Sequence, residues 1–183
     1  MSTEQRITTV HDYNGTGKWS AQEIVNRYLH YCSELGIQSS EKIRPGETVQ
    51  GHVKWIYPVM DEIIEGIRAG DAACAAIGIE FIEEDQSFSF GMSLKSATAR
   101  ALRRATFSRP QILRLRRRFA EMLVRGYVPQ EFKEYARLFR KIGLGGWWPY
   151  IQANIPPDKP CAVQWYEYFQ EHIRNGTISI SDD

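Results

Sequence analysis

The chain has 183 residues, of which 43% are hydrophobic and 25% charged, with a formal net charge of +1. These proportions argue against intrinsic disorder and are typical of a globular protein with room for one substantial core. Three widely spaced cysteines exclude a disulfide framework and a C-x-x-C metal motif, so they are expected to be buried thiols in a reducing compartment.

The net charge hides a strong asymmetry along the chain. Residues 1–93 carry 7 Lys or Arg and 14 Asp or Glu, residues 94–141 carry 14 and 3, and residues 142–183 carry 2 and 5. The three segments therefore have net charges of −7, +11 and −3. Such an asymmetry indicates an anionic partner, although a molecule whose acidic part covers its basic part has the same pattern.

The N-terminal third begins with polar residues and continues with a helix. Residues 1–18 are expected to form a flexible segment. A helix is predicted to follow, because Ser20 and Glu23 match a capping box and Gly36 is suited to end the helix.

A loop with its turn at Pro45-Gly46 follows, and the next helix is predicted over about residues 52–69. Pro58 marks a kink or a later start of this helix, since proline has no amide hydrogen to donate. Residues 77–91 alternate apolar and polar positions around an acidic turn, which predicts a small β-hairpin. Residues 177–181, "TISIS", are a candidate third strand.

Three closely spaced helices are predicted at about residues 93–105, 109–125 and 129–142. An irregular aromatic connector and a last helix, about residues 160–174, complete the chain. The simplest architecture is mainly α, with about six helices and a small hairpin.

We expect a single compact domain over residues 19–176. It comprises an acidic part (19–92), a basic three-helix part (93–143) and an aromatic C-terminal part (144–176), followed by a tail (177–183).

Each of the three basic helices has an apolar stripe and an opposite stripe of cations. Arg116 is the exception, because it projects into the apolar arc, where it is expected to extend past the core or to pair with a buried carboxylate. The cations of the outer faces are the candidate nucleic-acid-binding residues: Arg100, Arg103, Arg104, Arg114, Arg117, Arg118, Arg125, Lys133, Arg137, Arg140 and Lys141.

Arginine outnumbers lysine eleven to three in residues 94–141, a choice that suits bidentate recognition of phosphate. We therefore expect a non-enzymatic protein that binds nucleic acid mainly through phosphates, with little sequence selectivity. The alternative is a protein-interaction module, such as an adaptor, inhibitor or subunit, that uses the same face for an acidic protein or for self-association as a homo-oligomer.

A competing interpretation is that the acidic segment neutralises the basic helices. Asp61, Glu62, Glu65 and residues 80–86, "EFIEEDQ", would then supply the counter-charge.

Catalytic and cofactor motifs do not emerge from the sequence, and an enzyme is the third hypothesis. "NGTGKWS", residues 14–20, lacks the first glycine and the Ser or Thr after lysine that a phosphate-binding loop requires. The carboxylates at 61, 62 and 65 have no histidine at ligand spacing, so no metal and no cofactor is expected.

The segment after the basic helices contains Trp147, Trp148 and Tyr150. These rings would stack on unpaired bases if exposed, but they more often fix a connector to the core. With no apolar run long enough for a membrane span and no signal-peptide pattern, a cytoplasmic location without membrane contact is expected.

Overall fold

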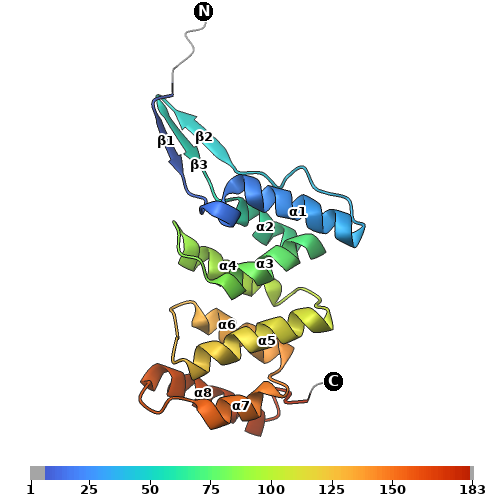
Figure 1. The fold of residues 1–183 in the computed structure, drawn as a ribbon, viewed down its shortest axis with the longest axis vertical. Helices are drawn as coiled ribbons and strands as arrows, with labels where there is room; N and C mark the ends of the chain where they lie inside the picture. Colours follow the sequence, from blue (N-terminus) through green and yellow to red (C-terminus); the bar gives the residue numbers. More distant parts are fainter. Residues whose placement is uncertain (1–6, 182–183) are drawn as a thin grey trace, which may run out of the picture. The chain divides into compact units, whose positions relative to one another are not determined.

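The computed structural model describes residues 7–181, which form eight α-helices, one 3-10 helix and three short strands (Figure 1). The predicted class, mainly helical with a small sheet, is confirmed. The chain divides after Ala101 into two compact units, here called unit 1 (up to Ala101) and unit 2 (from Leu102). The expectation of a single domain over residues 19–176 stays a prediction.

Unit 1 contains a three-stranded sheet of strands β1 (Thr9–Asp12), β2 (Glu47–Gln50) and β3 (Val53–Ile56). The central strand β3 pairs in parallel with β1 and antiparallel with β2. Gly51, with φ of +61°, lies in the turn between β2 and β3, where positive φ favours glycine. All residues of β1 and β2 are exposed and those of β3 are half-buried, so the sheet contributes no buried residue to the core.

The hairpin prediction was wrong in position. Residues 77–91 belong mostly to helix α3 (Ala72–Glu84), and helix α4 (Gly91–Leu102) begins at their end. Because α3 is buried nearly all round, its apolar run has no one-sided helical period and resembles a strand. The third strand is β1, inside the segment 1–18 that was expected to be flexible, whereas residues 177–181 form no strand.

The first helices of unit 1 follow local capping chemistry. After the 3-10 helix η1 (Gly17–Trp19), the Ser20 hydroxyl accepts a hydrogen bond from the amide of Glu23 and begins α1 (Ala21–Leu35). Gly36, with φ of +64°, ends α1, so the predicted first helix is confirmed.

Helix α2 (Val59–Arg68) starts directly after Pro58, which shows that this proline marks a late start and not a kink. Helix α3 packs against both α1 and α2. The carboxylate of Asp71 caps α3 by accepting from the amides of Ala73 and Cys74. The core of unit 1 is therefore a three-helix packing with α3 as its most buried element.

Unit 2 consists of four helices: α5 (Arg109–Val124), α6 (Phe132–Ile142), α7 (Trp147–Asn154) and α8 (Pro160–Arg174). Helix α5 contacts the other three. Its start was predicted correctly, since Ser108 and Gln111 form a capping box. Helix α7 lies in the segment that was expected to be an irregular connector.

Aromatic rings form much of the core of unit 2. The ring of Phe119 on α5 lies 5.4 Å from that of Tyr135 and 5.5 Å from that of Phe139, both on α6. Phe139 in turn contacts Phe169 on α8, with the ring centroids 5.3 Å apart. These contacts fix which face of α6 is internal and leave its cationic face outside.

Arg116 lies inside unit 2, with only 6% of its surface exposed. It does not extend to the surface as expected; its Nε donates to the carbonyl oxygen of Gly143 at 3.0 Å, and Nη2 donates to that of Ile142 at 2.8 Å. These carbonyls stand at the C-terminal end of α6, where a cation is favoured by the helix dipole. Arg116 is therefore a buried helix cap.

Candidate functional site

Four cations gather around one hollow of unit 2. The hollow has a volume of about 400 Å³ and is lined by Arg103, Arg137, Arg140, Lys141 and Thr177. Three of the cations come from the last turns of α6, because residues three and four positions apart share a helix face. Arg103 comes from the turn after α4 and Thr177 from the segment after α8. We call this the cationic hollow.

A single carboxylate holds two of these arginines. Glu134 lies 3.0 Å from Nη1 of Arg137 and 3.4 Å from Nη2 of Arg103. Its side chain is only 12% exposed, while those of the two arginines are 41% and 30% exposed. Glu134 therefore orders both guanidinium groups and neutralises one of the four charges.

Arg140 is held by aromatic residues of α8. Its Nη1 donates to the hydroxyl of Tyr168 at 3.1 Å and lies 3.3 Å from Nε2 of His172. The hydroxyl of Thr177 donates to the carbonyl of His172 and lies 3.1 Å from Nδ1 of its ring. In the tautomer that carries its hydrogen on Nδ1, the ring donates to the Thr177 hydroxyl and its Nε2 accepts from Arg140.

Lys141 is an exposed residue whose amine is fixed at the hollow. Its Nζ donates to the carbonyl of Ala105 at 2.7 Å and lies 5.2 Å from the centre of the Phe107 ring. Burial lowers the pKa of Lys141 below its ordinary value, since the charged amine has lost part of its hydration. A bound anion would restore favourable interactions to this charge.

The other predicted residues lie outside the hollow. Arg104, Arg114, Arg125 and Lys133 are exposed, and Arg118 is half-buried. Arg117 is exposed and pairs with Glu121 on the same helix at 3.0 Å. Arg100 lies on α4 in unit 1 and lines a different hollow, with Tyr57 and Phe90 among its walls. The structure thus brings together four of the eleven candidates.

Two cations of the basic segment do not belong to the surface. Lys95 is 5% exposed and pairs with Asp85 inside unit 1, and Arg116 caps α6. Sequence reasoning missed Thr177 altogether, since only tertiary folding brings this residue from the far end of the chain to α6.

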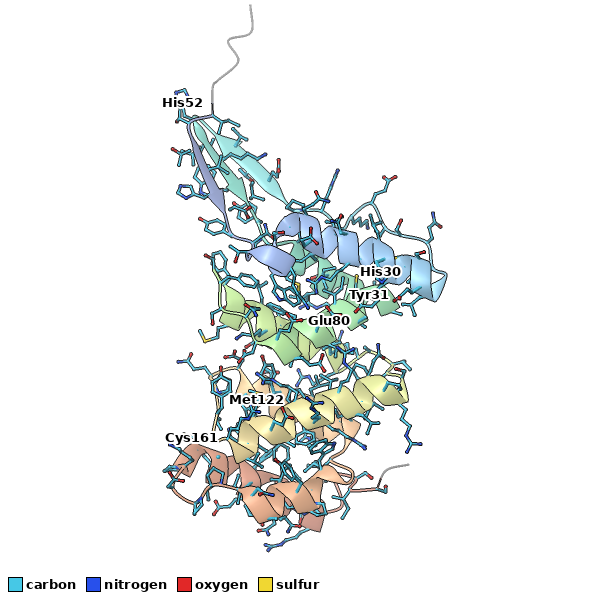
Figure 2. The ribbon with its side chains drawn as sticks, in the orientation of Figure 1. His30, Tyr31, His52, Glu80, Met122 and Cys161 are labelled. Atoms are coloured by element: carbon cyan, nitrogen blue, oxygen red, sulfur yellow. The ribbon has the colours of Figure 1, made fainter. Side chains whose placement is uncertain are left out.

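Glu80, Glu84 and Asp85 of the acidic segment have partners within unit 1. Glu80 accepts from Arg27 and from the hydroxyl of Tyr31, which points toward it in Figure 2. Glu84 accepts from the indole of Trp19 at 2.9 Å and pairs with Lys18. These carboxylates stabilise the packing of α1 on α3.

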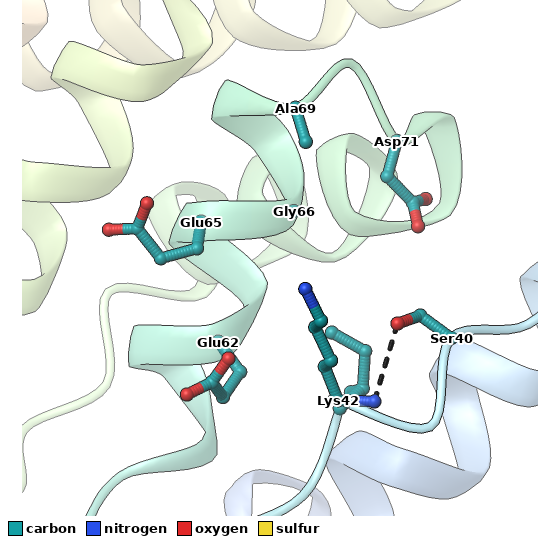
Figure 3. A pocket seen from close by; sticks show the side chains of 8 residues that line it. Ser40, Lys42, Glu62, Glu65, Gly66, Ala69 and Asp71 are labelled. Carbon is teal, nitrogen blue, oxygen red and sulfur yellow. Dashed lines mark hydrogen bonds between the residues drawn. The ribbon is translucent and has the colours of Figure 1, made fainter.

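A second hollow, in unit 1, has a volume of about 390 Å³ and mixed charge (Figure 3). Lys42 points into it, between Glu62 and Glu65 of α2 and Asp71. Asp71 already caps α3 and accepts from Tyr28 at 2.9 Å, so it has a structural role.

The described part of the chain shows no preformed metal site, and one of its buried thiols is held in the protonated form. Among residues 7–181, no group of three His, Cys, Asp or Glu side chains is arranged to hold a metal ion. Cys74 is buried, and burial raises the pKa of its thiol, which keeps it protonated and unreactive.

The aromatic residues after α6 differ in exposure. Trp148 is buried and stacks on Tyr166 of α8, with ring centroids 5.2 Å apart. Tyr150 is exposed, and its ring meets that of Trp147 edge-on. Trp148 therefore fixes α7 to the core.

The chain matches no family model, no curated protein and no solved structure. Within residues 7–181, no helix has both the length and the apolar composition that crossing a bilayer requires.

Proposed function

We propose that unit 2 binds nucleic acid through its phosphates and that the cationic hollow is the anchoring contact. The observation that carries this proposal is the convergence of four cations on a single hollow whose lining contains no carboxylate. Like charges held together are unfavourable unless an anion accompanies them. Phosphate oxygens match both the fork of an arginine and the ammonium of a lysine.

The surroundings favour an extended polyanion. Residues 102–183 carry 14 Lys or Arg and 8 Asp or Glu, a net charge of +6. Two exposed cations are close in sequence to residues of the hollow. Arg104 follows Arg103, and Lys133 lies four residues before Arg137. These side chains neutralise phosphates but do not distinguish bases well, so binding is expected to depend weakly on sequence.

Salt-titrated binding to a duplex and to a single-stranded oligonucleotide tests the proposal. The logarithm of the affinity should fall linearly with the logarithm of salt concentration, by about 0.9 per neutralised phosphate on duplex DNA and about 0.7 on a single strand. Arg137→Ala and Arg114→Ala should each weaken binding and flatten the slope.

Arg68→Ala is the matched control, because Arg68 is an exposed, glutamate-paired arginine of unit 1. Its slope should equal that of the wild type. Absence of binding at about 50 mM salt, where phosphate contacts are strong, would contradict the proposal.

A further inference from the structure

The side chains of the cationic hollow are preorganised, unlike those of the remaining cationic surface. Each of its four cations is held by a neighbour: Arg103 and Arg137 by Glu134, Arg140 by Tyr168, and Lys141 by the carbonyl of Ala105. A surface that follows a nucleic-acid backbone only by charge needs no such fixation. Fixed donors around one volume are suited to one compact anion.

We propose that the cationic hollow binds a phosphate monoester, namely the terminal phosphate of a nucleic-acid strand, an inference that rests on the proposed function. A monoester carries a charge of about −1.5 to −2 at neutral pH and three oxygens that accept hydrogen bonds. An internal phosphodiester carries a single charge and has two such oxygens. Three arginines and one lysine in one hollow match the terminal group better.

The donors at the hollow are sufficient for this anion. Each guanidinium has five N–H groups and each ammonium three, more than the contacts to Glu134, Tyr168 and Ala105 use. Glu134 balances one positive charge at the rear of Arg103 and Arg137, so a net charge close to +3 faces a dianion. Thr177 adds a hydroxyl oxygen to the wall.

The rest of the nucleic-acid strand would extend along α6. Lys133 precedes Arg137 by one helical turn, about 6 Å along the axis, and lies on the same face. Lys133 and Arg104 are exposed, and they would contact the phosphodiesters that follow the terminal phosphate.

The test compares two single-stranded oligonucleotides of one sequence, which differ only in a 5′-phosphate or a 5′-hydroxyl, each with a dye at the 3′ end. The intact 183-residue chain should bind the phosphorylated strand at least tenfold more tightly at fixed salt. The double variant Arg140→Gln/Lys141→Gln should abolish this preference.

Lys133→Gln/Arg114→Gln is the control, because it removes the same charge outside the hollow. This variant should lower the affinity for both strands by the same factor, so the ratio of the two affinities should not change. Equal affinity of the wild type for both strands would overturn the monoester inference while leaving the proposed function intact. Failure to bind either strand would overturn the proposed function itself.

Two further probes separate the sources of a phosphate monoester. Inorganic phosphate should compete with the phosphorylated strand more than with the hydroxyl strand, because only the former places a phosphate monoester in the hollow. A neutral peptide with one phosphoserine should bind more weakly than the phosphorylated strand, since it lacks the following phosphates. Tighter binding of the peptide would overturn the assignment to nucleic acid.

The preference for the 5′-phosphorylated strand over the 5′-hydroxyl strand should depend on pH. The second pKa of a phosphate monoester is about 6, so the affinity ratio of the two strands should rise between pH 5 and pH 7. A constant ratio over this range would contradict recognition of the dianion.

Discussion

Arg116 and Arg117 are neighbours in the sequence with opposite environments. Arg116 is 6% exposed and donates to two carbonyls at the end of α6, whereas the Arg117 side chain is 66% exposed and pairs with Glu121. The helical wheel separated the two correctly. It could not identify the partners of Arg116, since the carbonyls lie on another helix.

Arg116→Met should lower the free energy of unfolding by about 2–4 kcal/mol, because it removes charge-assisted hydrogen bonds and leaves buried carbonyls unsatisfied. Arg117→Met should change it by less than about 0.5 kcal/mol, since an exposed ion pair contributes little. Urea titration measures both. Equal effects of the two substitutions would contradict the capping role.

The three thiols should differ in reactivity. Cys161 is exposed, while Cys32 and Cys74 are buried, and burial raises the pKa of the Cys74 thiol. A thiol reagent should modify one cysteine in the native protein and all three after unfolding. Rapid modification of Cys74 under native conditions, located by mass spectrometry, would show that unit 1 opens.

The affinity for a phosphorylated strand should fall at alkaline pH as Lys141 loses its proton. Since burial lowers the pKa of Lys141 below 10.5, its charge and the affinity for a phosphorylated strand are lost at a lower pH than for an ordinary lysine. Lys141→Arg should keep its affinity over that range, because arginine stays charged. Titration of both proteins between pH 8 and pH 10.5 should therefore show diverging affinities; parallel curves would contradict the prediction.

As the pH rises through this range, the contribution of Lys141 to the free energy of unfolding should increase, while the affinity for phosphate should fall. The native state binds the Lys141 proton less tightly than the unfolded chain does. This residue therefore makes the native state more stable as the pH rises from below its lowered pKa toward 10.5.

At the scale of elements, prediction succeeded where local chemistry determines the structure. Helices α1 and α5 have capping residues next to a one-sided apolar stripe, and both were predicted correctly. Helix α3 was predicted as a strand because burial on all sides removes the helical period. The hairpin β2–β3 was missed because residues 52–56 were assigned to the next helix. Its four-residue strands show no alternation of buried and exposed positions.

The packing of α2 on α3 depends on Gly66. A Cβ at this position would overlap with Sγ of Cys74. Gly66→Ala should therefore destabilise the protein by about 1–3 kcal/mol, despite the better helix propensity of alanine. The same substitution in a Cys74→Ala background should cost less, because the clashing sulfur is absent. Urea titration of the four proteins gives this coupling, and an unchanged cost would contradict the contact.

At the scale of the whole molecule, the separation of charge was visible in the sequence but the site was not. The helical periodicity of residues 129–142 predicted the cationic face of α6, on which Arg137, Arg140 and Lys141 lie together. Arg103 and Thr177 reach the same hollow from the two ends of unit 2, and such tertiary proximity cannot be derived from spacing along a chain.

The most direct test of phosphate binding compares two variants with equal loss of charge. One replaces Arg103, Arg137, Arg140 and Lys141 by glutamine; the other replaces Lys42, Arg44, Lys54 and Arg68 of unit 1 by glutamine. Affinity for a phosphorylated oligonucleotide at about 100 mM salt should fall at least a hundredfold in the first and less than threefold in the second, with circular dichroism confirming that both are folded. An equal loss in the two variants would contradict a localised phosphate site.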